Sequence, residues 1–161
     1  MDISIRNMQR SDLEKVLELD RLSFTLPWPE RAFAYELEHN PNSRCRVAEL
    51  TGENDPILVG MIVAWLIVDE IHIATLAVHP EYRRRKIGHK LLAITLIDGV
   101  KSGATCSFLE VRHSNVAARA LYESFGYEKS GIRKAYYKDN FEDAILMDLN
   151  RIDLSLLESL Q

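Results

Sequence analysis

One stretch decides the fold of this chain: residues 76–92, which read LAVHPEYRRRKIGHKLL. An apolar run stops at Pro80, four consecutive cations occupy positions 83–86, and apolar residues then recur at helical spacing. This pattern predicts a strand, a turn and the start of a helix. Backbone N–H groups in the first turn of a helix lack partners within the helix and carry the positive end of its dipole. We therefore expect the turn to bind an anion, here a phosphorylated cofactor.

The residues before this stretch predict two helices and several strands. Alternating or continuous apolar runs indicate strands, whereas apolar residues at helical spacing behind a capping residue such as Ser11 indicate a helix. Residues 24–29 break the helical pattern, because Pro29 is tolerated only in a first turn, and form a candidate substrate-facing loop. The expected elements are strand 3–8, a helix from Ser11, helix 30–37, strands 44–50 and 57–68 as a hairpin with a bulge near Gly60, and strand 71–78.

The residues after it predict strands separated by helices. Gly103 and Gly126 are expected helix stops, and Asn115 is an expected helix N-cap. The expected elements are helix 87–101, strand 106–112, helix 116–125, strands 127–137 and 141–149, and a short helix within 152–160. The order βααβββαβαββ predicts an α+β fold with three αβα layers. Its mixed, mostly antiparallel sheet of about seven strands has helices on both faces.

The composition favours one compact domain. The chain has 161 residues, of which 47% are hydrophobic, and its net charge of −4 argues against general nucleic-acid binding. The longest apolar run, 57–68, is too short to span a bilayer, and the first residues lack a signal-peptide pattern. Cys45 and Cys106 have the spacing of neither a disulfide framework nor a zinc site. We expect no metal, no membrane partner and a cytoplasmic location.

Three groups of residues resemble the Gcn5-related N-acetyltransferase (GNAT) superfamily. YRRRKIG at 82–88 resembles the acetyl-CoA loop of that family. FLEVRHSN at 108–115, with Ala118, ALYE at 120–123 and FGY at 125–127, resembles the branch that acetylates protein N-termini. LPW at 26–28, RKAYY at 133–137 and EDA at 142–144 are similar to bacterial ribosomal-protein-alanine acetyltransferases of the RimI type. The resemblance implies a GNAT domain over residues 1–149 and a C-terminal extension over 150–161.

The resemblance implies acetyl-CoA as the co-substrate. Strand residues Leu76, Ala77 and Val78 would pair with the pantetheine amides, as an added strand pairs with a sheet edge. The turn would hold the pyrophosphate, with contacts from Arg84, Arg85, Lys86, Ile87, Gly88 and His89. Asn115 is a further cofactor ligand by resemblance, and this role can coexist with capping the helix.

Lys86 departs from the family pattern, because it stands where the loop usually has its first glycine. If this position requires a positive φ, a side chain there costs free energy. Alternatively, the turn is already helical and Lys86 only adds charge.

The resemblance implies Glu110 as the general base and Tyr122 as the acid that protonates the departing thiolate. Alternation along strand 106–112 places Phe108, Glu110 and Arg112 on one face. A carboxylate in this apolar strand must be paired or functional. The structural alternatives are an ion pair of Glu110 with Arg112 or another cation, and a core position for Tyr122.

The chain is thus expected to transfer acetyl from acetyl-CoA to a protein N-terminal α-amino group by direct attack. The resemblance implies ribosomal protein S18, with its N-terminal alanine, as the acceptor. Pro27, Trp28, Tyr136 and Tyr137 are candidates for the walls of the peptide slot. A lysine or small-amine acetyltransferase and a non-catalytic acyl-CoA sensor are alternatives. A monomer or weak dimer is expected.

Overall fold

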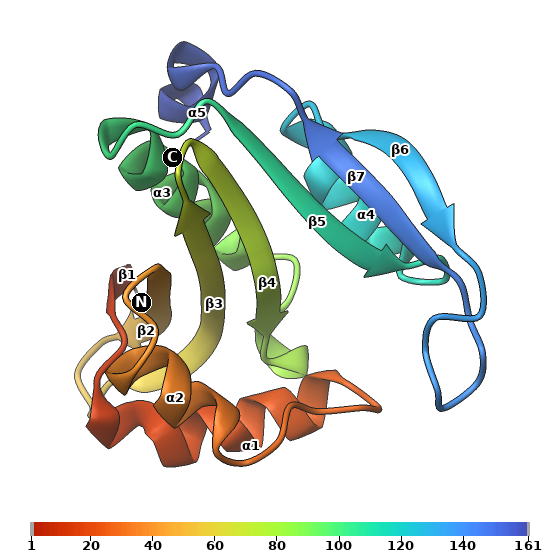
Figure 1. The fold of residues 1–161 in the computed structure, drawn as a ribbon. Helices are drawn as coiled ribbons and strands as arrows, with labels where there is room; N and C mark the ends of the chain where they lie inside the picture. The colour runs from red at the N-terminus through yellow and green to blue at the C-terminus, as the bar shows by residue number, and fades with distance from the viewer. Residues whose placement is uncertain (1, 161) are drawn as a thin grey trace.

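The computed structural model describes residues 2–160, and a seven-stranded sheet forms its centre (Figure 1). The strands lie in the order β1-β2-β3-β4-β5-β7-β6. Their bounds are β1 Asp2–Asn7, β2 Ser43–Thr51, β3 Ile57–Ile67, β4 Glu70–Val78, β5 Cys106–Arg112, β6 Glu128–Arg133 and β7 Ala144–Leu149. The predicted order of elements and the mixed, mostly antiparallel sheet are confirmed.

The sheet separates into two halves between β4 and β5. These strands are parallel and pair only over Glu70–Ile73 and Cys106–Leu109, whereas all other neighbouring strands are antiparallel. Beyond Ile73 and Leu109 the two strands diverge, as Figure 1 shows. The second half of β4 therefore has an edge that no other strand of the described chain covers.

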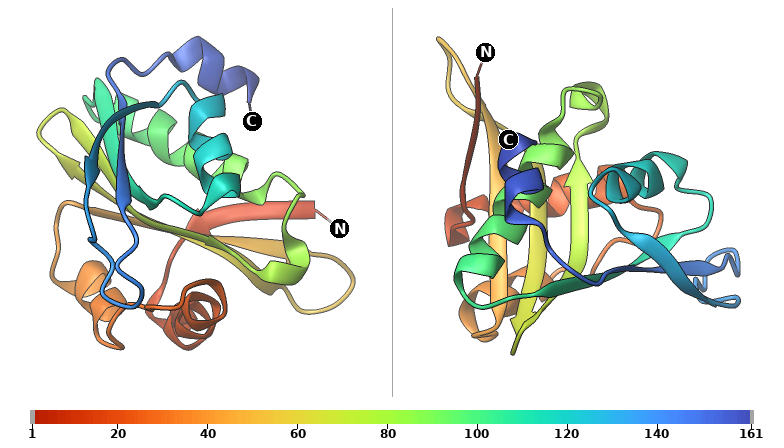
Figure 2. Two further views of the ribbon diagram at one scale, coloured as in Figure 1. Left: turned by 90° about the vertical axis from the view of Figure 1, so that its right-hand side faces the viewer. Right: turned by 90° about the horizontal axis from the view of Figure 1, so that it is seen from above.

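Helices cover both faces of the sheet (Figure 2). Helices α1 Leu13–Ser23 and α2 Ala32–Glu38 lie on one face, and α3 Ile87–Lys101, α4 Val116–Ser124 and α5 Leu154–Ser159 lie on the other. Short 3₁₀ turns, Arg10–Asp12 and Pro80–Tyr82, precede α1 and α3. The three αβα layers predicted from the sequence are confirmed.

Each face of the sheet has its own hydrophobic core. Val16, Leu19 and Phe33 from α1 and α2 pack on one face, together with buried side chains of β2, β3 and β4. The larger core on the other face includes Leu91 and Leu157, from α3 and α5. The C-terminal helix is thus part of the main core.

Close packing of α3 on the sheet depends on Gly60. A Cβ there would lie 3.0 Å from both Ile87 Cγ2 and Leu91 Cδ1. The register between β2 and β3 shifts beside this glycine, since Ala48 pairs with Gly60 but Glu49 pairs with Leu58. The predicted bulge near Gly60 is confirmed.

The last hairpin is shorter than its sequence predicts. The strands expected over 127–137 and 141–149 end at Arg133 and begin at Ala144, and residues 134–143 form a loop, here the β6–β7 loop. Ala135 and Phe141 have φ values of 50° and 56°, which strand residues do not adopt. Aromatic residues in this loop resemble strand residues locally, but their contacts with other elements override that tendency.

Candidate active site

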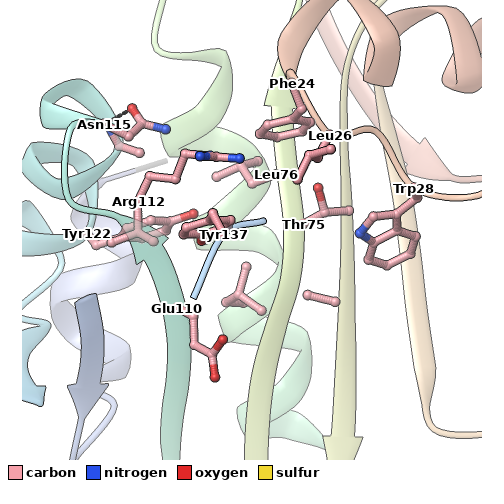
Figure 3. A pocket seen from close by; sticks show the side chains of 14 residues that line it. Phe24, Leu26, Trp28, Thr75, Leu76, Glu110, Arg112, Asn115, Tyr122 and Tyr137 are labelled. Atoms are coloured by element: carbon pink, nitrogen blue, oxygen red, sulfur yellow. Dashed lines mark hydrogen bonds between the residues drawn. The ribbon is translucent and has the colours of Figure 1, made fainter. Parts of the chain in front are cut away.

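A pocket lies where β4 and β5 separate (Figure 3). Its volume is about 220 Å³. The lining combines apolar side chains with a few polar groups, a composition typical of ligand sites. It consists of Phe24, Leu26, Trp28, Ile73, Ala74, Thr75, Leu76, Glu110, Val111, Arg112, Asn115, Ala118, Tyr122 and Tyr137.

A second, more open pocket of about 730 Å³ adjoins the first. Glu110, Trp28 and Tyr137 line both pockets, so the two form one continuous depression around Glu110. Tyr136 and Arg133 line only the second pocket. The structure therefore brings together the predicted catalytic pair and three of the four predicted slot residues, whereas Pro27 lines neither pocket.

Glu110 presents its carboxylate to this depression. Leu109 and Val111, its neighbours in β5, are buried on the opposite face, as the alternation predicts. The Glu110 side chain is 32% exposed, and Oε1 lies 3.2 Å from Nε of Arg133 on β6. The pairing suggested for Glu110 thus occurs with Arg133, not with Arg112. Because Arg133 is 55% exposed, the pair contributes little to stability.

Tyr122, on α4, is more deeply buried than Glu110. Its residue is 6% exposed, and its ring packs edge-on against Tyr127 with 5.6 Å between centroids. Burial raises the pKa of the Tyr122 phenol above its ordinary value, and no hydrogen bond within residues 2–160 offsets the rise. The Tyr127 hydroxyl, by contrast, donates a 2.7 Å bond to Ser107 Oγ. Tyr122 is therefore a neutral phenol at the pocket wall.

The predicted cofactor strand follows the free edge of β4. Leu76 lines the pocket, whereas Ala77 is buried in the core under α1 and α2. The Val78 carbonyl accepts a 3.1 Å bond from Arg83 Nε, which fixes the chain direction as it enters the turn. Backbone groups of β4 beyond Ile73 have no β5 partner. They can therefore bind an extended amide-containing group.

The cationic turn is not helical before α3. Arg84 and Lys86 both have left-handed backbones, with φ values of 64° and 60°, and Lys86 is the N-cap of α3. The alternative of an already helical turn is therefore wrong, and Lys86 occupies a conformation that glycine adopts more readily. Gly88 brings α3 close to α4, since a Cβ there would lie 3.3 Å from Leu121 Cδ2. The unpaired N–H groups of Ile87, Gly88 and His89 lie in this first turn.

His89 and Asn115 complete the predicted cofactor residues. Burial lowers the pKa of His89, whose ring lies 5.9 Å from that of Phe125. Asn115 caps α4, since its Oδ1 accepts the Ala118 N–H at 3.2 Å, and it also lines the pocket. The expected N-cap is confirmed, and the role of the same side chain as a cofactor ligand stays a prediction.

The acceptor-side aromatic residues come from two separate segments. Trp28 stacks on Phe33 with 4.9 Å between ring centroids, and its backbone N–H donates a 2.7 Å bond to Asp20 Oδ2. Tyr136 and Tyr137 lie across the site in the β6–β7 loop, with 5.2 Å between their rings. The charge of Glu110 raises the pKa of Tyr136. Trp28 thus faces the site and is also anchored in the core.

Sequence reasoning missed several lining residues. Phe24 and Leu26 belong to the segment 24–29, which interrupts the helical pattern and is predicted as a candidate substrate-facing loop. This interruption is the sequence signal that could have identified them. Arg112 was noted only as a partner for Glu110, and its contacts are with the β6–β7 loop. Within residues 2–160, no group of three His, Cys, Asp or Glu side chains could hold a metal ion. No helix of that range is long and apolar enough to cross a membrane.

The model of the acetyltransferase (GNAT) family matches residues 13–127. This match covers most of the chain, including the predicted catalytic pair and the cationic turn. The chain therefore belongs to the GNAT family and is an N-acetyltransferase.

Two relatives and one solved structure resemble the chain over nearly its whole length. The ribosomal protein bS18-alanine N-acetyltransferase of Escherichia coli (strain K12) is 33% identical over 148 residues, 91% of this chain and 96% of the relative. A Bacillus subtilis relative, provisionally named as the same enzyme, is 38% identical over 144 residues, 89% of this chain and 93% of the relative. The crystal structure of the Escherichia coli ribosomal-protein-S18-alanine N-acetyltransferase matches with a TM-score of 0.81 and 32% identity, covering 94% and 96%. The resemblance inferred from the motifs is confirmed.

Proposed function

We propose that this chain transfers the acetyl group of acetyl-CoA to the N-terminal α-amino group of a protein, with the N-terminal alanine of ribosomal protein bS18 as the acceptor. The observation that carries the proposal is the pocket at the β4–β5 separation, which both Glu110 and Tyr122 line. The relatives, named for this acceptor and similar over about nine-tenths of the chain, support it.

Glu110 is the proposed general base. A free α-amino group has a pKa of about 7.7–8.0, so a single proton transfer makes it nucleophilic near neutral pH. The carboxylate is partly exposed and lines both pockets, so it can accept this proton directly or through one water. The amine nitrogen then attacks the thioester carbonyl carbon, and the C–S bond breaks as the C–N bond forms. The nitrogen releases its second proton to solvent as the amide forms, Glu110 returns its proton to solvent, and Tyr122 regains from solvent the proton that it gives to sulfur.

Tyr122 is the proposed general acid. The leaving sulfur carries the electron pair of the broken C–S bond and needs a proton. Because burial raises the pKa of Tyr122, the phenol keeps its proton throughout the neutral range. It can therefore donate that proton to the thiolate as the bond breaks. Cys45 and Cys106 take no part, since both thiols have raised pKa values, chiefly through burial, and neither lines the pocket.

Residues 76–78 and 84–89, with Asn115, are the proposed acetyl-CoA contacts. The uncovered edge of β4 supports pantetheine pairing, and the Val78 N–H would stabilise charge on the thioester oxygen. The cations and free N–H groups at the start of α3 support pyrophosphate binding. Lys86 adopts the left-handed backbone, so its side chain does not prevent the loop geometry.

Trp28, Tyr136 and Tyr137 are the proposed walls of the acceptor slot, with Pro27 as part of the same segment. We further propose a cytoplasmic enzyme, a monomer or weak dimer, that binds no nucleic acid directly. The net charge of −4 supports the last point. Residues 1–149 are the proposed catalytic domain and 150–161 its extension.

The test uses a peptide with the bS18 N-terminal sequence and one internal lysine, with the N-terminus free or formylated. Intact-mass analysis after incubation with acetyl-CoA should show one added acetyl group on the free peptide only. Acetylation of the formylated peptide would replace this proposal with lysine transfer. Glu110→Gln should lower kcat by about 10²-fold or more without changing acetyl-CoA affinity. An unchanged kcat would exclude Glu110 as the general base.

A further inference from the structure

Arg112, at the end of β5, lines the pocket (Figure 3) and is the centre of a cluster of polar contacts with the β6–β7 loop. Its side chain is 18% exposed and donates to both carboxylate oxygens of Asp139, at 3.0–3.1 Å. A further bond of 3.3 Å reaches Glu142 Oε1, which lies in the same β6–β7 loop. Arg112 therefore fixes the second half of this loop to β5.

The same guanidinium also holds an aromatic wall of the pocket. Its Cζ atom lies 3.9 Å from the centroid of the Tyr137 ring, a cation–π contact. The Tyr137 N–H donates to the Glu142 carbonyl at 3.2 Å, so backbone and ring are both restrained. Since Tyr137 lines both pockets, its position sets the width of the depression on that side.

Asp139 joins this loop to the opposite wall. Its Oδ2 accepts a 2.7 Å bond from the hydroxyl of Thr25. Thr25 lies between Phe24 and Leu26, which both line the pocket from the segment after α1. In Figure 1 the tip of the β6–β7 loop lies near this segment, although the two are far apart in the sequence. We define the contacts of Arg112, Asp139 and Thr25 as the latch.

We propose that Arg112 is a positioning residue for the acceptor: through Tyr137 and the latch it holds the two walls of the slot at a fixed separation. The proposal rests on the function proposed above. None of the side-chain contacts of the latch involves residues 76–78, residues 84–89 or Asn115, which are assigned to acetyl-CoA, so the effect should fall on acceptor binding.

The chemistry of arginine suits this role. The planar guanidinium offers five donors in a fork, which can serve Asp139, Glu142 and the face of Tyr137 together. A lysine ammonium keeps the charge but provides neither the bidentate geometry nor a flat surface for stacking. Arg112→Lys therefore removes positioning while leaving the charge.

The kinetic test compares Thr25→Val with Thr25→Ser and Arg112→Lys. Loss of the Thr25 hydroxyl should raise the acceptor-peptide KM about fivefold, while Thr25→Ser, which keeps the hydroxyl, should match wild type. Arg112→Lys should raise it about tenfold or more. The KM for acetyl-CoA should change less than twofold in all three. A loss of melting temperature with an unchanged acceptor KM, or parallel changes in both KM values, would show a merely structural role.

Trypsin cleavage at Lys138, inside the loop, measures the latch without turnover. Thr25→Val should be cleaved several-fold faster than wild type and Thr25→Ser at the wild-type rate. Lys134→Ala is the control: it removes the exposed pair with Asp143 and the trypsin site at position 134, and its cleavage at Lys138, followed by fragment mass, should keep the wild-type rate. Equal cleavage of all four proteins would overturn the latch. If wild type acetylates no peptide but Thr25→Val is still cleaved faster, the proposed function and the positioning role both fail, and the latch itself stands.

Discussion

Replacing Lys86 by glycine should stabilise this protein while weakening its affinity for acetyl-CoA. Lys86 has a φ of 60° and a ψ of 17° and is the N-cap of α3. An L-residue in this left-handed conformation costs about 1–2 kcal/mol, because Cβ approaches the following carbonyl oxygen. Glycine escapes that contact. On folding, however, glycine loses more conformational entropy than alanine does, and this loss costs about 0.5–1 kcal/mol more.

The difference leaves a net gain of about 0.5–1 kcal/mol in the free energy of unfolding of Lys86→Gly. For a chain of 161 residues this corresponds to a rise of about 1–4 °C in Tm. Lys86→Ala should show no such gain, because it keeps Cβ and loses only the ammonium group. Both variants remove the same charge, so both should raise the acetyl-CoA KM alike, by about two- to fivefold.

Urea denaturation of wild type, Lys86→Gly and Lys86→Ala gives the first quantity, and steady-state kinetics with varied acetyl-CoA gives the second. The comparison separates backbone geometry from charge. If Lys86→Gly is no more stable than Lys86→Ala, the backbone strain inferred at Lys86 is refuted. A KM that rises in Lys86→Ala but not in Lys86→Gly would refute the charge contribution, since neither variant has an ammonium group.

The two buried tyrosines should respond differently to loss of their hydroxyls. Tyr122→Phe should lower kcat by about 10²-fold or more with little change in Tm, and a wild-type kcat would exclude it as the acid. Tyr127→Phe should leave kcat per folded molecule unchanged. It should lower the free energy of unfolding by about 1–2 kcal/mol, because Ser107 Oγ loses its partner; equal urea midpoints would contradict this. In a third test, the free energy of unfolding of Asp12→Asn should fall less steeply than that of wild type as the pH is lowered. The Arg6 guanidinium holds the pKa of Asp12 below its ordinary value, so its contribution is present above about pH 4 and lost as the pH falls through the lower folded pKa. Urea denaturation at several pH values between 2 and 7 measures this contribution. Identical pH profiles of Asp12→Asn and wild type would exclude a stabilising Arg6–Asp12 pair.

Elements with strong local signals were predicted with their observed bounds. Helix α3 covers 87–101 and strand β5 covers 106–112, as expected, because hydrophobic periodicity, a stop glycine and β-branched or aromatic residues agree there. The motifs around Glu110, Asn115 and Tyr122 also sufficed to indicate the family. These residues lie within one strand–helix unit, so their spacing in sequence carries over to their spacing in the fold.

Long-range contacts decided what such patterns could not. The segment with Tyr136, Tyr137 and Phe141 has the composition of a strand, yet it forms a loop held by Arg112 of β5 and by Thr25, which lies after α1. The partner of Glu110 was likewise open. Residues two apart in a strand share a face but lie nearly 7 Å apart, and Arg112 finds two carboxylates in the loop. Arg133, on β6, is left to pair with Glu110.

The stretch LAVHPEYRRRKIGHKLL shows the same division. Its sequence alone predicts a strand, a cationic turn and a helix, because each of these is determined by residues that are neighbours in the chain. It cannot decide whether Lys86 is helical or left-handed, since a cationic turn is compatible with both. In the structure Lys86 is the left-handed N-cap of α3, and Gly88, two residues later, lies against Leu121 of α4, a contact between segments brought together only by folding.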